Sequence, residues 1–529
     1  MIPKETLFPE NILKLQISTV DFFHFKALRF SFASLLLLLL LALLLSHQAL
    51  SKEIKLPVLG DTTSGIVSKQ QEYHLGRAWL KAFRGRVREF DDPLMQNYLE
   101  EIIYNLATYS ELENPNIELV IVKNPTMNAF AVPGGIVGIH TGLFSYAENE
   151  DQMVSVLAHE LAHLSQRHFA RGLEARRASS TLSLAGLLAG LALSATVGGD
   201  AGMAAITATQ ALTMENQLRY SRSNEKEADQ FGLRTLQRAG RDPGAAADMF
   251  ETMLKRLRYA GNRPPEFLLT HPVTEKRIAD ARGRTMDSSM RHYPDHPDYY
   301  LIKARAQVAM ENNNKDSLKR FNALLEANTQ QKDAANYGMA LAYIELKNFK
   351  KANELLGSLL FNNPDQLAFQ YTDIELDIAQ QDYKGALSKL TSLINKNPGN
   401  YPLLSLKAEA LWLDHQYEKS SDVLTLLSRQ RSEDPSIWYR LAEVRGLAGN
   451  ISGVHEARAE YFILIGAFKL AREQLSLALK LVLADFKRSS VIQQRLRDVI
   501  SMDSSLESFR MKSWSRLRCW WPNSKNQGF

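Results

Sequence analysis

Two histidines lie four residues apart in the stretch VLAHELAHLSQRH, and a glutamate directly follows the first of them. Four residues make about one turn of an α-helix, so the imidazoles of His159 and His163 would project to the same side, as two ligands of one zinc ion must. Glu160 would lie beside them, where a carboxylate can take a proton from a water molecule that attacks a carbonyl carbon. The spacing therefore predicts a metal-dependent hydrolase, and the alternative is an amphipathic helix that happens to carry histidine.

A catalytic zinc ion takes three protein ligands and leaves its fourth position to water, so a third ligand is needed. The segment SRSNEKEADQFGLRTLQRAG supplies carboxylates on a helix that Ser223 or Asn224 can cap: Glu225, Glu227 and Asp229. Glu225 and Asp229 share one face, whereas Glu227 points about 200° away from Glu225. We predict that Glu225 binds the metal, that Asp229 orients a metal-binding imidazole, and that Glu227→Ala leaves zinc content and activity unchanged. The alternative is a solvated acidic helix start.

The helix that carries the two histidines has a recognisable beginning. Asn149 followed three residues later by Gln152 can form a capping box, and apolar residues then recur at helical spacing: Met153, Leu157, Leu161 and Leu164. An earlier region, from about Glu72 to Ser110, also has apolar residues one turn apart, at Leu94, Tyr98, Ile102 and Leu106. Helices therefore both precede and carry the motif.

Between these helices the pattern changes to that of β-structure. The segment IELVIVKNPTMNAFAVPGGIVGIHTGLF is rich in β-branched residues and broken by turn residues. It predicts strands at Ile117–Val122, Ala129–Val132 and Ile136–Ile139, the last two joined by a turn at Pro133–Gly135. A small sheet is therefore expected directly before the motif.

The C-terminal half contains an internal repeat of 34 residues. Aromatic residues recur at that interval (Phe349, Tyr383, Tyr417), as do small residues three positions later (Ala352, Ala386, Ser420) and prolines (Pro364, Pro398). This is the tetratricopeptide (TPR) pattern of stacked helix pairs, and such arrays present a concave groove to peptides or partner proteins. A plain helical bundle is the alternative.

Composition excludes some functions. The chain has 529 residues, 23% of them charged, and a formal net charge of +5, which is a mild bias and not the concentrated basic stripe of a nucleic-acid-binding protein. We therefore expect no nucleic-acid partner. The single cysteine, Cys519, allows no intramolecular disulfide and so does not indicate a redox compartment.

The N-terminal region has the layout of a secretory signal. Lys26 and Arg29 precede an uncharged apolar run, Phe30–Leu45, which is followed by small residues. The longer uncharged span Phe30–Leu50 could instead be retained as a membrane anchor. Either alternative exports the bulk of the chain.

A second apolar segment, Ser180–Leu212, has Asp200 as its one charge. Because each apolar half is short and diluted by glycine, we expect a buried helical hairpin broken at Gly198 and Gly199, with peripheral membrane contact as the alternative. Together the patterns predict four regions: a signal peptide or anchor at 1–51, a metalloprotease domain at 60–292, a repeat domain at 296–485 and a basic tail at 486–529.

Four motifs in order resemble those of a known family: NAFAVPGG at Asn128–Gly135, HELAH at His159–His163, ExxxD at Glu225–Asp229 and THPVTEKRI at Thr270–Ile278. The family is that of the zinc metallopeptidases that include the CaaX prenyl proteases and the heat-shock protease HtpX, and within it the periplasmic, TPR-containing BepA/YfgC-like branch. The resemblance implies a mainly α protein, in which an α+β zincin-like domain with a small sheet precedes a TPR solenoid. It also implies one zinc ion held by His159, His163 and Glu225. Glu160 would be the general base.

The same resemblance places the predicted second strand beside the active-site cleft. An extended substrate would add its backbone to this edge and meet four residues there: Asn128, Ala129, Phe130 and Ala131. The implied function is hydrolysis of misfolded or stalled outer-membrane proteins in the periplasm, with chaperone activity and with repeats that contact substrates or the outer-membrane assembly machinery. Two parts depart from the family pattern, namely the long segment before Lys26 and the basic end KSWSRLRCWWPNSKNQGF.

His271 lies in the last of the four motifs, before Pro272, which disfavours a helical conformation for the residue ahead of it. The resemblance places this segment near the active site, where a neutral imidazole has two roles open to it. It can act catalytically, by donating a hydrogen bond to the oxyanion of the transition state, or it can occupy the fourth position of zinc and displace water. Of the two we favour the blocking role, and a packing role is the remaining alternative.

Two other functions fit part of the pattern. A non-proteolytic TPR chaperone or scaffold would use zinc only to hold its fold, but such a site has no need of Glu160. An integral-membrane protease would need several apolar spans, which the sequence lacks.

Overall fold

The computed structural model describes residues 67–172, 221–259, 265–286, 292–327 and 331–517. These residues belong to one unit of the chain, Thr63–Phe529. The predicted signal or anchor and the segment Ser180–Leu212 lie outside the described residues. Within the described ranges no helix is both long and apolar enough to cross a membrane.

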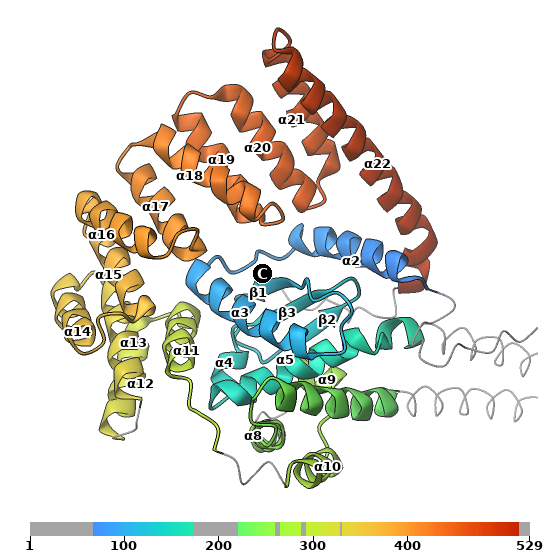
Figure 1. The fold of residues 1–529 in the computed structure, drawn as a ribbon, viewed down its shortest axis with the longest axis vertical. Helices are drawn as coiled ribbons and strands as arrows, with labels where there is room; N and C mark the ends of the chain where they lie inside the picture. Colours follow the sequence, from blue (N-terminus) through green and yellow to red (C-terminus); the bar gives the residue numbers. More distant parts are fainter. Residues whose placement is uncertain (1–66, 173–220, 260–264, 287–291, 328–330, 518–529) are drawn as a thin grey trace, which may run out of the picture. The chain divides into compact units, whose positions relative to one another are not determined.

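The first half of the described chain places helices around a small sheet (Figure 1). In chain order the elements are α2 (Lys69–Arg84), α3 (Pro93–Tyr109), β1 (Glu118–Val122), β2 (Ala129–Val132), β3 (Ile136–His140), α4 (Leu143–Tyr146), α5 (Glu150–Ser165), a helix over residues 221–238, α8 (Ala245–Tyr259), α9 (Glu266–Thr270) and α10 (Glu275–Thr285). The three predicted strands agree with β1, β2 and β3 to within one residue at each end. The predicted start of the acidic helix is wrong, because residues 221–224 are already helical.

The sheet has the strand order β1-β3-β2, with β1 parallel and β2 antiparallel to β3. The turn between β2 and β3 requires glycine, since Gly134 and Gly135 have φ angles of 84° and 77°. A Cβ atom on Gly134 would also lie 2.9 Å from Cα of Tyr73 in α2. The turn is therefore fixed both by its backbone angles and by the helix packed against it.

Strand β2 lies at the edge of the sheet. The N–H of His140 donates to the carbonyl of Asn128 at 3.0 Å, so these two residues form a hydrogen-bonded pair of the antiparallel ladder. Such pairs alternate along a ladder, and the backbone groups of Ala129 and Ala131 therefore point away from β3. Among the described strands none pairs with this outer edge.

Helix α5 begins where the sequence predicts, but its capping differs in one detail. The side chain of Asn149 accepts a hydrogen bond from the N–H of Gln152 at 2.9 Å. The side chain of Gln152 accepts from the N–H of Glu148 instead of returning to Asn149, so the capping box is not closed. The helix is buried along most of its length, from Glu150 to Ala162.

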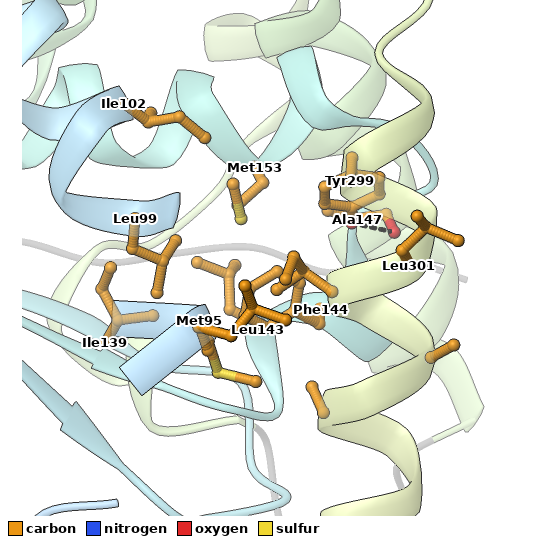
Figure 2. Packing of buried hydrophobic residues seen from close by; sticks show 14 of the residues in the cluster. Met95, Leu99, Ile102, Ile139, Leu143, Phe144, Ala147, Met153, Tyr299 and Leu301 are labelled. Atoms are coloured by element: carbon orange, nitrogen blue, oxygen red, sulfur yellow. Dashed lines mark hydrogen bonds between the residues drawn. The ribbon is translucent and has the colours of Figure 1, made fainter. Parts of the chain in front are cut away.

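The core between α3, β3, α4 and α5 also includes α11 (Pro297–Met310), as Figure 2 shows. Tyr299 on α11 is fully buried, stacks on Phe144 of α4 and donates its hydroxyl hydrogen to the carbonyl of Ala147 at 2.9 Å. Leu301 belongs to the same core cluster. The hydrophobic core is therefore continuous across the boundary predicted between the two domains, and that boundary stays a prediction.

The second half consists of helices that follow one another in stacked pairs (Figure 1). They are α12 (Asn314–Glu326), α13 (Lys332–Glu345), α14 (Phe349–Asn362), α15 (Leu367–Ala379), α16 (Tyr383–Lys396), α17 (Tyr401–Leu413), α18 (Tyr417–Gln430), α19 (Pro435–Leu447), α20 (Ile451–Leu464), α21 (Phe468–Leu481) and α22 (Phe486–Leu517). The prediction of a mainly α protein with a small sheet and a TPR array is confirmed.

The turn inside each repeat has a left-handed residue at the same interval of 34 residues: Lys347 (φ 57°), Gln381 (φ 66°), His415 (φ 60°) and Gly449 (φ 73°). Non-glycine residues seldom adopt this conformation, and here three different ones do. The turn geometry therefore sets the backbone at this position, whichever residue occupies it.

The segment predicted as a basic tail begins as the helix α22. Ile492 and Val499 on this helix are buried in a cluster with Ala471 and Leu475 of α21. The residues from Phe486 to at least Met502 thus pack as a further helix of the array.

Candidate metal centre

Four side chains from three separate segments converge on one point. His159 and His163 come from α5, Glu225 from the helix over residues 221–238, and His271 from the residue that ends α9. One ligand atom from each of the four lies within 4.8 Å of the others. All four side chains are buried or nearly so, because the helices pack around them.

The donor set fits a zinc ion. Nε2 of His159 and Nε2 of His163 lie 3.0 Å apart, and each lies 3.4 Å from an oxygen of Glu225. Lone pairs that face one another at such distances repel unless a proton or a cation lies among them. Two imidazoles and one carboxylate are also a ligand set of catalytic zinc sites. The side chains of His159, His163 and Glu225 thus lie close enough together to bind one ion. That they bind zinc stays a prediction.

The charge states of Glu225 and His163 suit metal binding. Burial alone would raise the pKa of Glu225, but the three histidines around it lower the pKa on balance, so the carboxylate is ionised. Burial lowers the pKa of His163 to about 4, so its ring is neutral at pH 7. A neutral imidazole and an ionised carboxylate are the forms that bind metals.

Gly232 lets the helix of Glu225 approach α5. It lies seven residues after Glu225, on the same helical face, and a Cβ atom there would lie 3.3 Å from the backbone nitrogen of His159. The two helices therefore cross closely at the metal centre. The approach explains how a carboxylate from one helix reaches imidazoles on the other.

Asp229 lies behind His159, as predicted for a residue that orients the ring. Its Oδ1 is 3.0 Å from Nδ1 of His159, and Arg277 on α10 donates to both of its oxygens, at 2.8 and 2.6 Å. Burial would lower the pKa of His159, but the carboxylates of Asp229 and Glu225 raise it to about 9. Arg277, which no sequence argument singled out, also lies 3.1 Å from Glu225 and ties both carboxylates to α10.

Glu160 is buried, with 1% of its surface exposed, beside the four converging side chains. Burial raises the pKa of its carboxyl group. The backbone N–H of Ala131, on the outer edge of β2, faces this carboxylate and partly offsets the rise in its pKa. The predicted base thus lies beside the predicted substrate strand. In that strand Asn128 and Ala129 are buried, and Phe130 and Ala131 are partly exposed.

His271 lies within the group and not at the surface. Its Nδ1 is 3.0 Å from Oε1 of Glu225 and 3.4 Å from Nε2 of His159, and its Nε2 is 3.7 Å from Oε1 of Glu160. It is outside a helix, as the following proline predicts. Its position is close enough to the other ligand atoms for a fourth ligand.

Glu227 points away from the metal centre, as the helical wheel predicts. Its Oε2 accepts from Arg171 at 2.9 Å and lies 3.3 Å from Nε2 of His168. His168 was not singled out from the sequence, although it ends the stretch that carries the motif. Burial lowers the pKa of His168 to about 3, so this ring is neutral at pH 7.

The sequence matches the profile of peptidase family M48 over residues 93–285 and a tetratricopeptide-repeat profile over residues 377–444. It is 32% identical over 426 residues to the beta-barrel assembly-enhancing protease of Escherichia coli (strain K12), which covers 80% of this chain and 86% of that protein. A putative beta-barrel assembly-enhancing protease of Vibrio cholerae is 33% identical over 445 residues, 82% of this chain and 89% of the relative. The mitochondrial metalloendopeptidase OMA1 of Schizosaccharomyces pombe is 30% identical over 203 residues, 37% of this chain and 57% of the relative. The first matched region contains all four converging side chains.

Proposed function

The chain belongs to peptidase family M48, in the group of the beta-barrel assembly-enhancing proteases, and is a metalloprotease; from this premise we propose that it is a zinc endopeptidase of the periplasm that cleaves misfolded or stalled outer-membrane proteins. Its ligands would be His159, His163 and Glu225, with one zinc ion per chain. The relatives' name supports a role in outer-membrane biogenesis.

The observation that carries the proposal is the position of Glu160. A metal site that only holds a fold has no use for a buried carboxyl group of raised pKa beside the ligands. A hydrolase needs such a group, since a base of raised pKa both takes and returns a proton near neutral pH. This argues against the alternative of a non-proteolytic scaffold.

In the reaction, zinc when bound would supply a Lewis acid that polarises the scissile carbonyl and makes the attacking water more acidic. Glu160 would hold the proton removed from this water and pass it to the nitrogen of the leaving amine. Asp229 would keep the His159 ring in place through the contact at its Nδ1. The burial of these groups would keep other water away from them.

The substrate would bind as an added strand on the outer edge of β2. Ala129 and Ala131 direct their backbone groups to this edge, and the N–H of Ala131 faces the carboxylate of Glu160. A peptide bound to this edge would therefore pass beside the base. Because main-chain hydrogen bonds supply the affinity, the sequence of the substrate would matter little.

The repeat array would capture the substrate or a component of the assembly machinery, as TPR grooves do. It is fixed to the protease region by ion pairs, such as that between Arg431 of the array and Glu100 of α3. Capture without cleavage would give the protein chaperone activity as well. The Glu160→Gln variant would then still suppress the aggregation of an unfolded outer-membrane protein.

The test is a cleavage assay with the full chain on an unfolded protein such as casein, with zinc measured on the same sample by mass spectrometry. We expect about one zinc ion per chain and cleavage that stops when a chelator removes it. Zinc-loaded, folded protein that cleaves neither casein nor an unfolded outer-membrane protein would overturn the proposal.

A further inference from the structure

The side of His163 that faces away from the metal centre begins a line of polar contacts. Nδ1 of His163 lies 2.9 Å from Nδ1 of His168, and Nε2 of His168 lies 3.3 Å from Oε2 of Glu227. Arg171 donates to the same carboxylate oxygen at 2.9 Å. The mechanism proposed above uses neither His168 nor Glu227.

One arrangement of protons satisfies these contacts when Nε2 of His163 binds a metal ion. A metal-binding nitrogen has no proton, so the proton of the neutral His163 ring is on Nδ1 and is donated to Nδ1 of His168. His168 then carries its own proton on Nε2 and donates it to Glu227. Each contact determines the next, and Glu227 accepts from both His168 and Arg171.

The backbone places His168 for this contact. Helix α5 ends at Ser165, and the chain makes a turn at Arg167, whose φ of 50° is unusual for a residue with a side chain. The buried side chain of Arg167 holds the turn, with Nε donating to Glu72 at 2.8 Å and Nη2 donating to the carbonyl of Val67 at 2.6 Å. The turn brings His168 back against His163, five residues earlier.

The other predicted metal-binding histidine, His159, has a corresponding support. Nδ1 of His159 contacts Asp229 directly, and Asp229 is held by Arg277. His163 is supported in the same way by a carboxylate and an arginine, Glu227 and Arg171. The difference is that the imidazole of His168 lies between His163 and the carboxylate. Glu227 faces away from the ligand atoms, so it is the poorer candidate for a ligand, but it can act on His163 through His168.

We propose that His168, held by Glu227, is a positioning residue for His163: it fixes the tautomer and the ring orientation that present Nε2 to the metal ion. The proposal rests on the zinc site of the proposed function. It differs from the expectation that Glu227→Ala is silent, because loss of Glu227 leaves His168 free to rotate or to change its tautomer.

The test measures the zinc dissociation constant, by competition with a chromophoric chelator, in full-length protein carrying Glu160→Gln so that self-cleavage does not interfere. His168→Phe removes the acceptor but keeps a ring, and we expect a 10- to 100-fold weaker affinity. His168→Asn places an amide oxygen near the position of Nδ1 and should restore most of the affinity. Glu227→Ala should weaken binding by about 10-fold.

Asp248→Ala is the matched control, since Asp248 is an exposed carboxylate paired with Arg282 and should leave zinc affinity unchanged. The absorption spectrum of the cobalt-substituted protein gives a second readout, because a tilted His163 ring changes the ligand field, whereas a general loss of stability does not. Equal affinity and equal spectra for the parent, His168→Phe and Glu227→Ala would overturn the positioning role. A parent protein that binds no zinc would instead overturn the proposed function.

Discussion

The carboxylate of Asp229 and the imidazole of His159 are 3.0 Å apart, on the side of the ring opposite the converging ligand atoms. Because this carboxylate and Glu225 raise the pKa of His159 to about 9, the metal-free protein carries a proton on this ring at pH 7. Zinc must displace that proton, so we expect binding to release about one proton and the affinity to rise about tenfold per pH unit between pH 7 and 8.5. Calorimetry in buffers of different ionisation enthalpy measures the release.

Asp229→Ala supplies the control for this prediction. Without the carboxylate the pKa of His159 falls, so less than one proton should be released at pH 7, and the loss of the orienting contact should weaken zinc binding 10- to 100-fold. Proton release equal to that of the parent would show that the proton comes from another group.

Glu160→Gln should lower the rate of peptide cleavage by a factor of about 100 to 10,000 while zinc stays bound, since the amide keeps the shape of the side chain but accepts no proton. In contrast, alanine at His159, His163 or Glu225 should lower both zinc content and activity. Activity and metal content are measured on the same preparations. If Glu160→Gln cleaves at the parent rate, the assigned base is wrong.

His271→Ala distinguishes the two roles of this imidazole. Because Nδ1 of His271 lies 3.0 Å from Glu225 and 3.4 Å from His159, a fourth ligand is the role we expect, and its removal should raise the cleavage rate. A catalytic role would instead lower the rate by about 100-fold, as loss of an oxyanion donor does. Rates are compared at full zinc occupancy, and an unchanged rate would leave His271 with a packing role.

Tyr299→Ala should lower the free energy of unfolding by about 3 to 5 kcal/mol, because it removes a fully buried ring from a core that spans the protease region and α11. Urea denaturation followed by fluorescence measures the change. The neighbouring Tyr300 is only partly buried, so Tyr300→Ala should cost clearly less. Equal effects would indicate that α11 is not part of this core in solution.

His140 gives a prediction for acid stability. Burial lowers its pKa from 6.5 to about 4, so protons bind the unfolded chain before they bind the folded one. The contribution of a neutral His140 is therefore complete above pH 6.5 and is lost as the pH falls toward 4, by up to about 3 kcal/mol. Unfolding of His140→Gln should depend less on pH in this window than unfolding of the parent, with zinc present in both samples; parallel curves would contradict this.

The ligand residues were accessible to sequence reasoning because each argument depended on one helix. Spacing along α5 determines the directions of His159 and His163, and the same rule separates Glu225 from Glu227. Of the supporting residues, Asp229 follows from the same helical spacing, whereas Arg277 and His168 reach the site through α10 and through a left-handed turn at Arg167. Their placement depends on tertiary packing, which no local pattern contains.

The repeats show the same limit. The 34-residue repeat has an aromatic residue at Tyr383 and Tyr417, but Ile451 at the equivalent position of the next unit. The aromatic pattern is therefore lost there, although the helices continue. The left-handed turns at His415 and Gly449 keep the interval because the path of the backbone requires it. The recurring positive φ angle therefore defines the repeat where the residue types no longer do.

The outer edge of β2, with which no described strand pairs, would let the proposed protease distinguish folded from unfolded barrel proteins. A strand inside a finished barrel has both rows of amide groups occupied by its neighbours and could form no ladder with Ala129 and Ala131. A strand that has not yet found its neighbours still has a free row of donors and acceptors. The hydrogen bonds that close a barrel would therefore also prevent its strands from binding to this edge and being cleaved. A barrel protein that closes slowly would stay open to cleavage for longer.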